Sequence, residues 1–316
     1  MSKAKSSSTA HNGSELRIGI SGWTYPPWRG VFYPADLAHR RELEFASRQV
    51  NSIEINGTFY ALQKPVSFQK WYEMTPEDFV FSVKGNRFIT HTRRLKEVEV
   101  PLANFFASGV LELGRKLGPV LWQFPPNFKF DPARVENFFK LLPRTMEEAA
   151  ELAQNHDRKI KDVVTVGFKI DGPVRHAMEI RHPSFATEEF ISLLREYNVA
   201  IVVADTAGKW PFIEDVTADF VYVRLHGDAE LYASGYSPEA LDRWAKKIGR
   251  WSLGGSPRGA KCISAPLPPR KEGRSVHVYF DNDIKVHAPF DAISLGSRFG
   301  LAPLEPSPMS MSSKPG

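Results

Sequence analysis

The stretch 178–185 of this sequence places three chemically useful side chains next to one another. As a β-strand it turns Glu179 and Arg181 to one face and apolar residues to the other, because strand side chains alternate. Pro183 ends the strand, and His182 stands just before it. A carboxylate, a guanidinium and an imidazole at one strand end can move a proton and hold an anion. For this strand alone, an ion pair on a solvated sheet explains the pattern equally well.

Other apolar stretches repeat this alternation and also carry polar residues close to their carboxyl ends. The residues concerned are Glu54, Asn56, Lys84, Gln123, Asp205, Arg224 and His226. Residues that only fill the interior of a sheet are usually branched and apolar, so these repeated polar ends favour a functional site.

The elements that carry these residues predict an α/β fold, a TIM-type (β/α)8 barrel in a single domain. The expected strands are residues 17–21, 52–56, 79–84, 119–124, 178–182, 200–205, 220–226 and 276–280. An open doubly wound sheet is the alternative, but no Gly-x-Gly-x-x-Gly sequence follows the first strand. In a barrel all carboxyl strand ends meet at one rim, so the polar residues are expected to converge there.

The barrel is expected over residues 16–301. The flanking residues 1–15 and 302–316 are rich in serine, proline and lysine and are predicted to be disordered. Insertions are expected near 145–172 and at 252–275. Between the third and fourth strands, one apolar helical stripe predicts a continuous helix that ends at Gly118. This stripe consists of Leu102, Phe105, Phe106, Val110, Leu113 and Leu117.

The composition is that of an ordinary globular protein, with 42% hydrophobic and 24% charged residues in a chain of 316. A formal charge of +5 suits an anionic ligand but is weak support for nucleic-acid binding. Cys262 is the single cysteine, so neither an internal disulfide nor a cysteine zinc site can form. No secretory signal and no apolar run of about 20 residues is visible, which predicts a cytoplasmic protein without membrane contact. The oligomeric state is left open.

Several motifs resemble the domain-of-unknown-function 72 family, which is also called YecE-like. They are SGWTY at 21–25, EINGTFY at 54–60, FSVK at 81–84, LWQFPP at 121–126, EIRHP at 179–183, VRLHG at 223–227 and FDND at 280–283. They stand at nearly every expected strand end. The resemblance implies a TIM-type barrel with one shared site, but it implies no reaction.

The charged strand ends favour an acid–base enzyme that acts on an anionic small molecule, phosphorylated or carboxylated, at the carboxyl-terminal face of the barrel. The candidate catalytic residues are Glu54, Glu179, Asp205, His182 and His226. The candidate substrate-binding residues are Lys84, Arg181, Arg224, Asn56, Gln123, Trp23, Tyr60 and Asn282. No metal and no cofactor is expected.

Two other enzyme or binding classes stay open. Single-stranded nucleic acid is the first, since aromatic residues in the same loops can stack bases beside arginines; they are Trp23, Tyr25, Trp28, Phe59, Tyr60 and Phe88. A metal-dependent hydrolase is the second, with possible ligands Glu54, Glu179, His182, Asp205, His226 and Asp281. Lys84, Arg181 and Arg224 would repel a divalent cation, which argues against it. A sensor without turnover would use the same residues as an enzyme.

Overall fold

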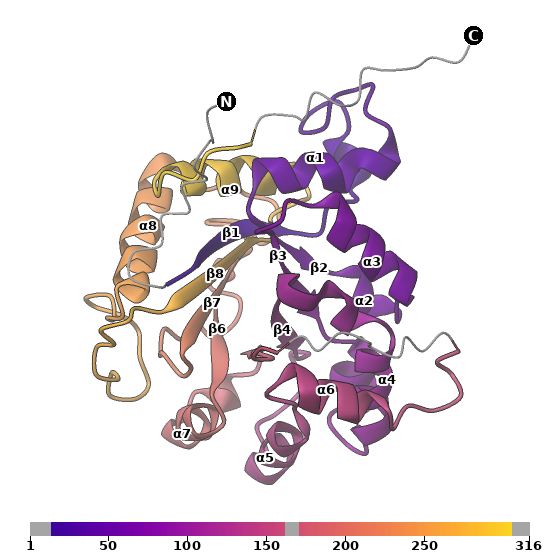
Figure 1. Ribbon diagram of the computed structural model, residues 1–316. Coiled ribbons are helices and arrows are strands. Elements are labelled where there is room, and N and C mark those ends of the chain that lie inside the picture. Colours follow the sequence, from indigo (N-terminus) through magenta and orange to yellow (C-terminus); the bar gives the residue numbers. More distant parts are fainter. Residues whose placement is uncertain (1–13, 162–170, 305–316) are drawn as a thin grey trace.

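The structure, a computed structural model, describes residues 14–161 and 171–304. Within them, eight parallel strands pair in chain order and close into a barrel (Figure 1). The strands are β1 (Leu16–Ser21), β2 (Ser52–Ile55), β3 (Val80–Lys84), β4 (Leu117–Gln123), β5 (His176–Glu179), β6 (Val199–Asp205), β7 (Phe220–Leu225) and β8 (Ser275–Phe280). Pairing of β1 with β8, where Ile18 lies opposite Val278, closes the ring. The predicted (β/α)8 barrel is confirmed.

Helices surround this barrel and cover the outward faces of its strands (Figure 1). They are α1 (Glu42–Gln49), α2 (Gly57–Tyr60), α3 (Pro65–Met74), α4 (Glu99–Ala107), α5 (Pro132–Leu141), α6 (Met146–Ala153), α7 (Glu188–Glu196), α8 (Pro238–Ser252) and α9 (His287–Ser297). Side-chain caps start several of them, as the sequence indicates: Thr145, Thr187 and Ser237 each accept a hydrogen bond from the backbone three residues on. In the described part of the chain, no helix has both the length and the apolar character needed to cross a membrane.

The predicted continuous helix before β4 is wrong. α4 ends at Ala107, and a 3-10 helix covers Val110–Lys116 after a break at Gly109. Gly109 has φ +114°, and a Cβ there would lie 2.5 Å from the Cα of Pro65. The start of α3 therefore approaches the backbone so closely that only glycine fits, and the helix cannot continue through this point.

The barrel lumen is filled by residues of one strand parity. Small residues such as Gly19, Ala177 and Ala200 leave room for the rings of Tyr222 and Tyr279, which are both fully buried. The Tyr279 hydroxyl lies 2.8 Å from Ser52 Oγ. Outward-facing residues of the same strands instead join the apolar core beneath the helices. The two parities thus separate a lumen with polar residues at its carboxyl end from a largely apolar shell beneath the helices.

The expected insertion at 252–275 is a long loop anchored by two buried carboxylates. Glu214 accepts a hydrogen bond from the backbone of Lys261, and Asp215 accepts from Ile263 and Ser264. Most of each predicted disordered tail, residues 1–13 and 305–316, lies outside the described residues, as does 162–170 of the other expected insertion. The described ends are hydrogen-bonded: Glu15 O accepts from Val276 N, and Leu304 N donates to Arg48 O.

Candidate functional site

Arg224 is the centre of a charged cluster at the carboxyl end of the barrel lumen. Its Nη2 lies 2.8 Å from Glu54 Oε1 and 2.9 Å from Asp281 Oδ2. Its Nη1 lies 2.7 Å from Glu179 Oε2. Burial alone would lower the pKa of Arg224, but the three carboxylates outweigh it and hold this pKa well above its usual value. The guanidinium is fully buried, so its donors are occupied by protein groups rather than open to a ligand.

Glu54 is held in place by further donors from the lumen. Tyr222 donates its hydroxyl to Glu54 Oε2 at 2.6 Å, and Ser21 Oγ donates to Oε1 at 3.0 Å. The Tyr222 hydroxyl also lies 2.6 Å from Ser82 Oγ. Because both carboxylate oxygens are satisfied inside the protein, Glu54 positions Arg224 and has no free face toward the rim.

Glu179 connects the buried cluster to the rim. Gln123 Nε2 donates to Glu179 Oε1 at 3.0 Å, and Arg181 Nε donates to the same oxygen at 3.1 Å. Burial would raise the pKa of Glu179, yet the charges of Arg224 and then Arg181 hold it well below the usual range. Glu179 is therefore an ionised carboxylate at neutral pH.

Arg181 is the more open of the two arginines, with a side chain 13% exposed. Its guanidinium carbon lies 3.8 Å from the ring centroid of Trp210, a cation–π contact. Its Nη2 also donates to the Tyr232 hydroxyl at 3.2 Å. The predicted juxtaposition of Glu179 and Arg181 on one face is confirmed, and stacking fixes the guanidinium at the edge of the site.

Asp281 and His226 form a second pair beside Arg224. His226 Nδ1 lies 3.0 Å from Asp281 Oδ2, and His226 Nε2 lies 4.0 Å from Glu179 Oε1. Burial would raise the pKa of Asp281, but Arg224 and His226 lower it to about 2. Asp283, two residues on, behaves in the opposite way: burial and the charge of Asp281 raise its pKa to about 6. One strand end therefore carries a permanently ionised acid and one that titrates close to neutrality.

Lys84 differs from the other lumen cations because no carboxylate of the described residues lies within ion-pair distance of it. Its side chain is nearly buried, at 8% exposure, and its Nζ lies 4.6 Å from the ring centroid of Phe59. Burial, followed by the charge of Arg224, lowers the pKa of Lys84 to about 8. A fraction of this amine is therefore uncharged at neutral pH.

Three predicted site residues are not brought to this cluster, and their expected placement is wrong. Asp205 faces outward and accepts a hydrogen bond from Tyr236 at 3.2 Å, because Ala204 takes the lumen position opposite Arg224. Asn282 donates to Asp291 Oδ2 at 2.8 Å, toward α9. His182 lies 2.9 Å from Ser184 Oγ, in the loop after β5.

The other predicted residues directly follow β1 and β2 along the chain. Trp23 packs edge-on against Trp71, with ring centroids 5.4 Å apart, and Tyr60 is 70% exposed on the rim. Asn56 directly follows β2 in a helical backbone conformation that starts α2, and the last β2 residue, Ile55, pairs with Val83 next to Lys84. Its buried Oδ1 has no hydrogen-bond partner among the described residues.

The sequence reasoning missed several contributors. The sequence predicts Asp281 only as a possible metal ligand, although alternation from the outward-facing Phe280 places it in the lumen. Ser21 and Tyr222 give no signal, because hydroxyl residues are common in strands. His91 follows β3, and burial together with the charges of Arg181 and Lys84 lowers its pKa to about 4. The His91 imidazole is therefore neutral at physiological pH.

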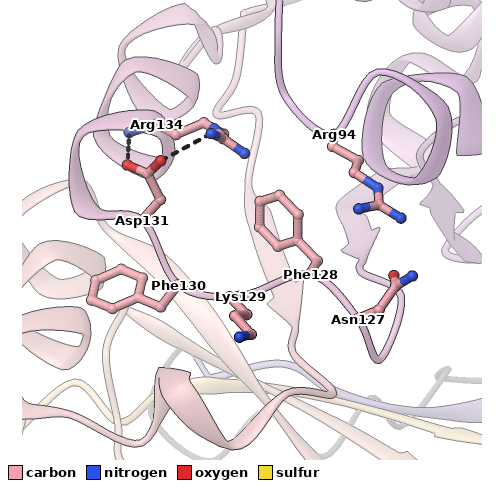
Figure 2. A pocket seen from close by; sticks show the side chains of 7 residues that line it. All are labelled: Arg94, Asn127, Phe128, Lys129, Phe130, Asp131 and Arg134. Carbon is pink, nitrogen blue, oxygen red and sulfur yellow. Dashed lines mark hydrogen bonds and ion pairs between the residues drawn. The ribbon is translucent and has the colours of Figure 1, made fainter.

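A separate cavity of about 350 Å³ lies on the same rim, between the loops that follow β3 and β4. Figure 2 shows Arg94 on one side and the segment from Asn127 to Arg134 on the other. Arg134 pairs with Asp131 at 3.0 Å. The lining is cationic on balance, with Lys129 as a further basic residue.

The acidic side chains are not arranged as a metal centre in the described residues, where no group of three or more histidine, cysteine or acidic side chains is placed to hold an ion. Glu54, Glu179 and Asp281 do converge, but the Arg224 guanidinium lies between them. The donor set therefore does not fit a divalent cation while Arg224 stays in place.

Fold and site together define a TIM-type barrel protein with an ion-pair cluster at the lumen mouth. The chain belongs to the family described as protein of unknown function DUF72, which matches residues 17–313. The resemblance seen in its motifs is thereby confirmed.

Two curated relatives share part of the sequence. UPF0759 protein YunF of Bacillus subtilis is 32% identical over 121 residues, and UPF0759 protein YecE of Escherichia coli is 31% identical over 113 residues. Each match covers 36% of this chain, and it spans only 41% of YunF and 39% of YecE. Neither name states an activity.

Solved structures of the family agree with the fold. A DUF72 family protein of Thermotoga maritima gives a TM-score of 0.67 at 25% identity, over 90% of this chain and 99% of that one. A DUF72 family protein of Enterococcus faecalis gives 0.66 at 17% identity, over 93% of this chain and 100% of that one. The second likeness concerns the fold alone.

Proposed function

We propose that this protein is an acid–base enzyme that acts on an anionic small molecule at the carboxyl-terminal face of its barrel. The observation that carries the proposal is the arrangement of cations around the buried cluster. Arg224 is saturated by carboxylates, whereas Lys84 has no acidic partner in the described residues and Arg181 is partly open. These two cations are the ones available to a phosphate or carboxylate group.

Proton transfer in this proposal belongs to titratable groups around Arg224. Asp283, with a pKa raised to about 6 by burial and by Asp281, exchanges a proton close to neutral pH. Glu179 stays ionised and orients Arg181, and His226 lies between Asp281 and Glu179. The proposed setting is cytoplasmic, which the single cysteine supports.

The test of the proposal is Arg181→Met. We expect the variant to fold with a loss of roughly 1 kcal/mol, because Glu179 keeps Arg224 and Gln123 as partners. Binding of inorganic phosphate and of citrate, measured by calorimetry, should weaken at least about tenfold, since one charge-assisted contact is lost. Arg115→Met, which breaks an exposed pair with Glu77, is the matched control and should change neither property. A collapsed melting temperature with unchanged affinity per folded molecule would make Arg181 structural and contradict the proposal.

The metal-hydrolase alternative predicts a different outcome in purified protein. Because Arg224 lies between the converging carboxylates, we expect natively purified protein to hold no stoichiometric divalent metal, as determined by elemental analysis. Chelator treatment should leave phosphate binding unchanged. One equivalent of a metal, lost together with ligand binding on chelation, would favour the hydrolase.

Exposed aromatic and basic residues on the rim favour single-stranded nucleic acid as the second candidate ligand. Tyr60 and Phe88 are 70% and 42% exposed, and the cationic cavity with Arg94 and Lys129 lies in the same ring of loops. Stacking and phosphate contacts would give binding that falls steeply with salt. Oligonucleotide affinity at two ionic strengths therefore separates this candidate from the first.

A further inference from the structure

Lys84 stands apart from every other charged side chain in the lumen. Arg224 contacts three carboxylates and Arg181 contacts Glu179, whereas the Lys84 ammonium meets the face of Phe59 at 4.6 Å. A surface lysine is hydrated, and a buried structural lysine donates hydrogen bonds to protein acceptors. Lys116, for example, donates to two carbonyl oxygens. Lys84 has neither arrangement, because it is 8% exposed and its Nζ has no hydrogen-bond acceptor in the described residues. Such a nearly buried, unpaired amine is costly for the fold.

The surroundings of Lys84 favour its nucleophilic form. Desolvation and a neighbouring cation are the two means by which proteins activate an amine. Both are present, because burial and the positive charge of Arg224 lower the Lys84 pKa from 10.5 to about 8. At pH 7 about a tenth of such amines is uncharged, a few hundred times the fraction of an ordinary lysine.

A buried polar atom close in the fold to Lys84 could meet the oxygen of a reacting carbonyl compound. Asn56 directly follows β2, whose last residue Ile55 pairs with Val83 next to Lys84, and its buried Oδ1 has no partner among the described residues. A hydroxyl formed next to the amine could donate to this oxygen. Arg181, on the same rim, supplies a cation for an anionic group of the same molecule.

We propose that Lys84 forms an imine with an anionic aldehyde or ketone, so that this site acts by covalent amine catalysis. The inference rests on the proposed function and names its substrate class. The Nζ lone pair attacks the carbonyl carbon, a C–N bond forms, and the carbonyl oxygen takes a proton to give a carbinolamine. Loss of water then gives the iminium ion. Counted from the ammonium form, amine and carbonyl yield iminium and one water, with no oxidant or reductant consumed. The iminium withdraws electrons from the adjacent carbon and makes its C–H bond more acidic, which suits the acid–base groups nearby.

Reductive trapping tests this inference. The full-length protein is incubated with pyruvate, glyoxylate or dihydroxyacetone phosphate, and sodium borohydride then converts any imine into a stable secondary amine. Intact-mass and peptide analysis locate the adduct. We expect one adduct per chain, on Lys84, with at least one of the three anionic probes and much less with acetone, which lacks the anionic group.

Two variants make the result specific. Lys84→Arg keeps a positive charge but provides no comparable nucleophile, and it should lose the adduct. Lys285→Met removes an exposed lysine paired with Glu230 after β8, and it should keep the adduct in full. Circular dichroism checks that both variants are folded.

The outcomes separate this inference from the proposed function. Absence of an adduct on Lys84 with all three probes, or equal labelling of surface lysines in Lys84→Arg, overturns the imine. If phosphate still binds in an Arg181-dependent manner in that case, the proposed function stands. Loss of anion binding altogether would overturn the proposed function itself.

Discussion

Arg224→Met is expected to destabilise the fold by about 3–5 kcal/mol or more, because three buried carboxylates lose the partner that they share. Glu54 would retain its donors Tyr222 and Ser21, but no other cation of the described residues lies within ion-pair distance of it. Urea unfolding at pH 7, followed by circular dichroism, measures the loss. The free energy of unfolding of Arg224→Lys should lie between those of the wild type and the methionine variant. A lysine ammonium keeps the charge but cannot contact three acids at once.

The pH dependence of Arg224→Met gives a second check. In the wild type the pKa of Asp281 is lowered to about 2, so its stabilising contribution is complete above pH 4 and is lost only as pH falls toward 2. Without Arg224 the buried acids should take up protons at higher pH, which relieves their repulsion. The difference in the free energy of unfolding between Arg224→Met and the wild type should therefore become smaller as the pH is lowered from 7 to 4. Arg115→Met serves as the exposed control. An unfolding midpoint equal to that of the wild type would show that the cluster does not hold the lumen together.

The alternation of polar and apolar residues was enough to find most of this cluster from the sequence. Glu54, Lys84, Glu179 and Arg224 each alternate with large apolar residues that must face the helices, so their lumen position follows from the strand geometry. Their mutual contacts could not be predicted in the same way. Which carboxylate meets which guanidinium depends on the stagger of strands far apart in the sequence, and Glu54 and Arg224 are 170 residues apart.

Asp205 shows where the alternation fails. Both faces of β6 are apolar, with Ala200, Val202 and Ala204 in the lumen and Ile201 and Val203 beneath the helices. A strand buried on both sides shows no amphipathic alternation, so the sequence does not indicate on which face of the strand the terminal acid Asp205 lies. Burial raises the pKa of Asp205, and its partner Tyr236 comes from the segment before α8, which the strand pattern cannot reveal.

The break at Gly109 has a different cause. The apolar stripe from Leu102 to Leu117 is correctly read as facing the core, since its residues are nearly all buried on either side of the break. The helix ends early because the first residue of α3, Pro65, occupies the space that a side chain at position 109 would need. That contact joins segments more than 40 residues apart and is invisible to a local periodicity.

The free energy of unfolding should also report the unusual state of Lys84. A lysine whose pKa is lower in the folded protein, about 8 against 10.5, destabilises the fold while it is charged in both states. Above pH 8 the folded protein releases this proton while the unfolded chain still holds it. The contribution of Lys84 to the free energy of unfolding therefore rises with pH up to about 10.5. A shift of this size corresponds to roughly 3 kcal/mol.

Lys84→Met is therefore expected to be more stable than the wild type at pH 7, and its advantage should decline by roughly 3 kcal/mol between pH 8 and pH 10.5. Methionine fills a similar volume beside Phe59 without a charge to desolvate. Urea unfolding of both proteins at four pH values provides the measurement, and Asp281, whose pKa is also lowered by Lys84, stays ionised across this range. Lys285→Met changes an exposed position, so its free energy of unfolding should differ from that of the wild type by a constant amount at every pH. If the difference between Lys84→Met and the wild type stays constant across this range, the amine is an ordinary ammonium in the folded protein, and its use as a nucleophile near neutral pH loses its physical basis.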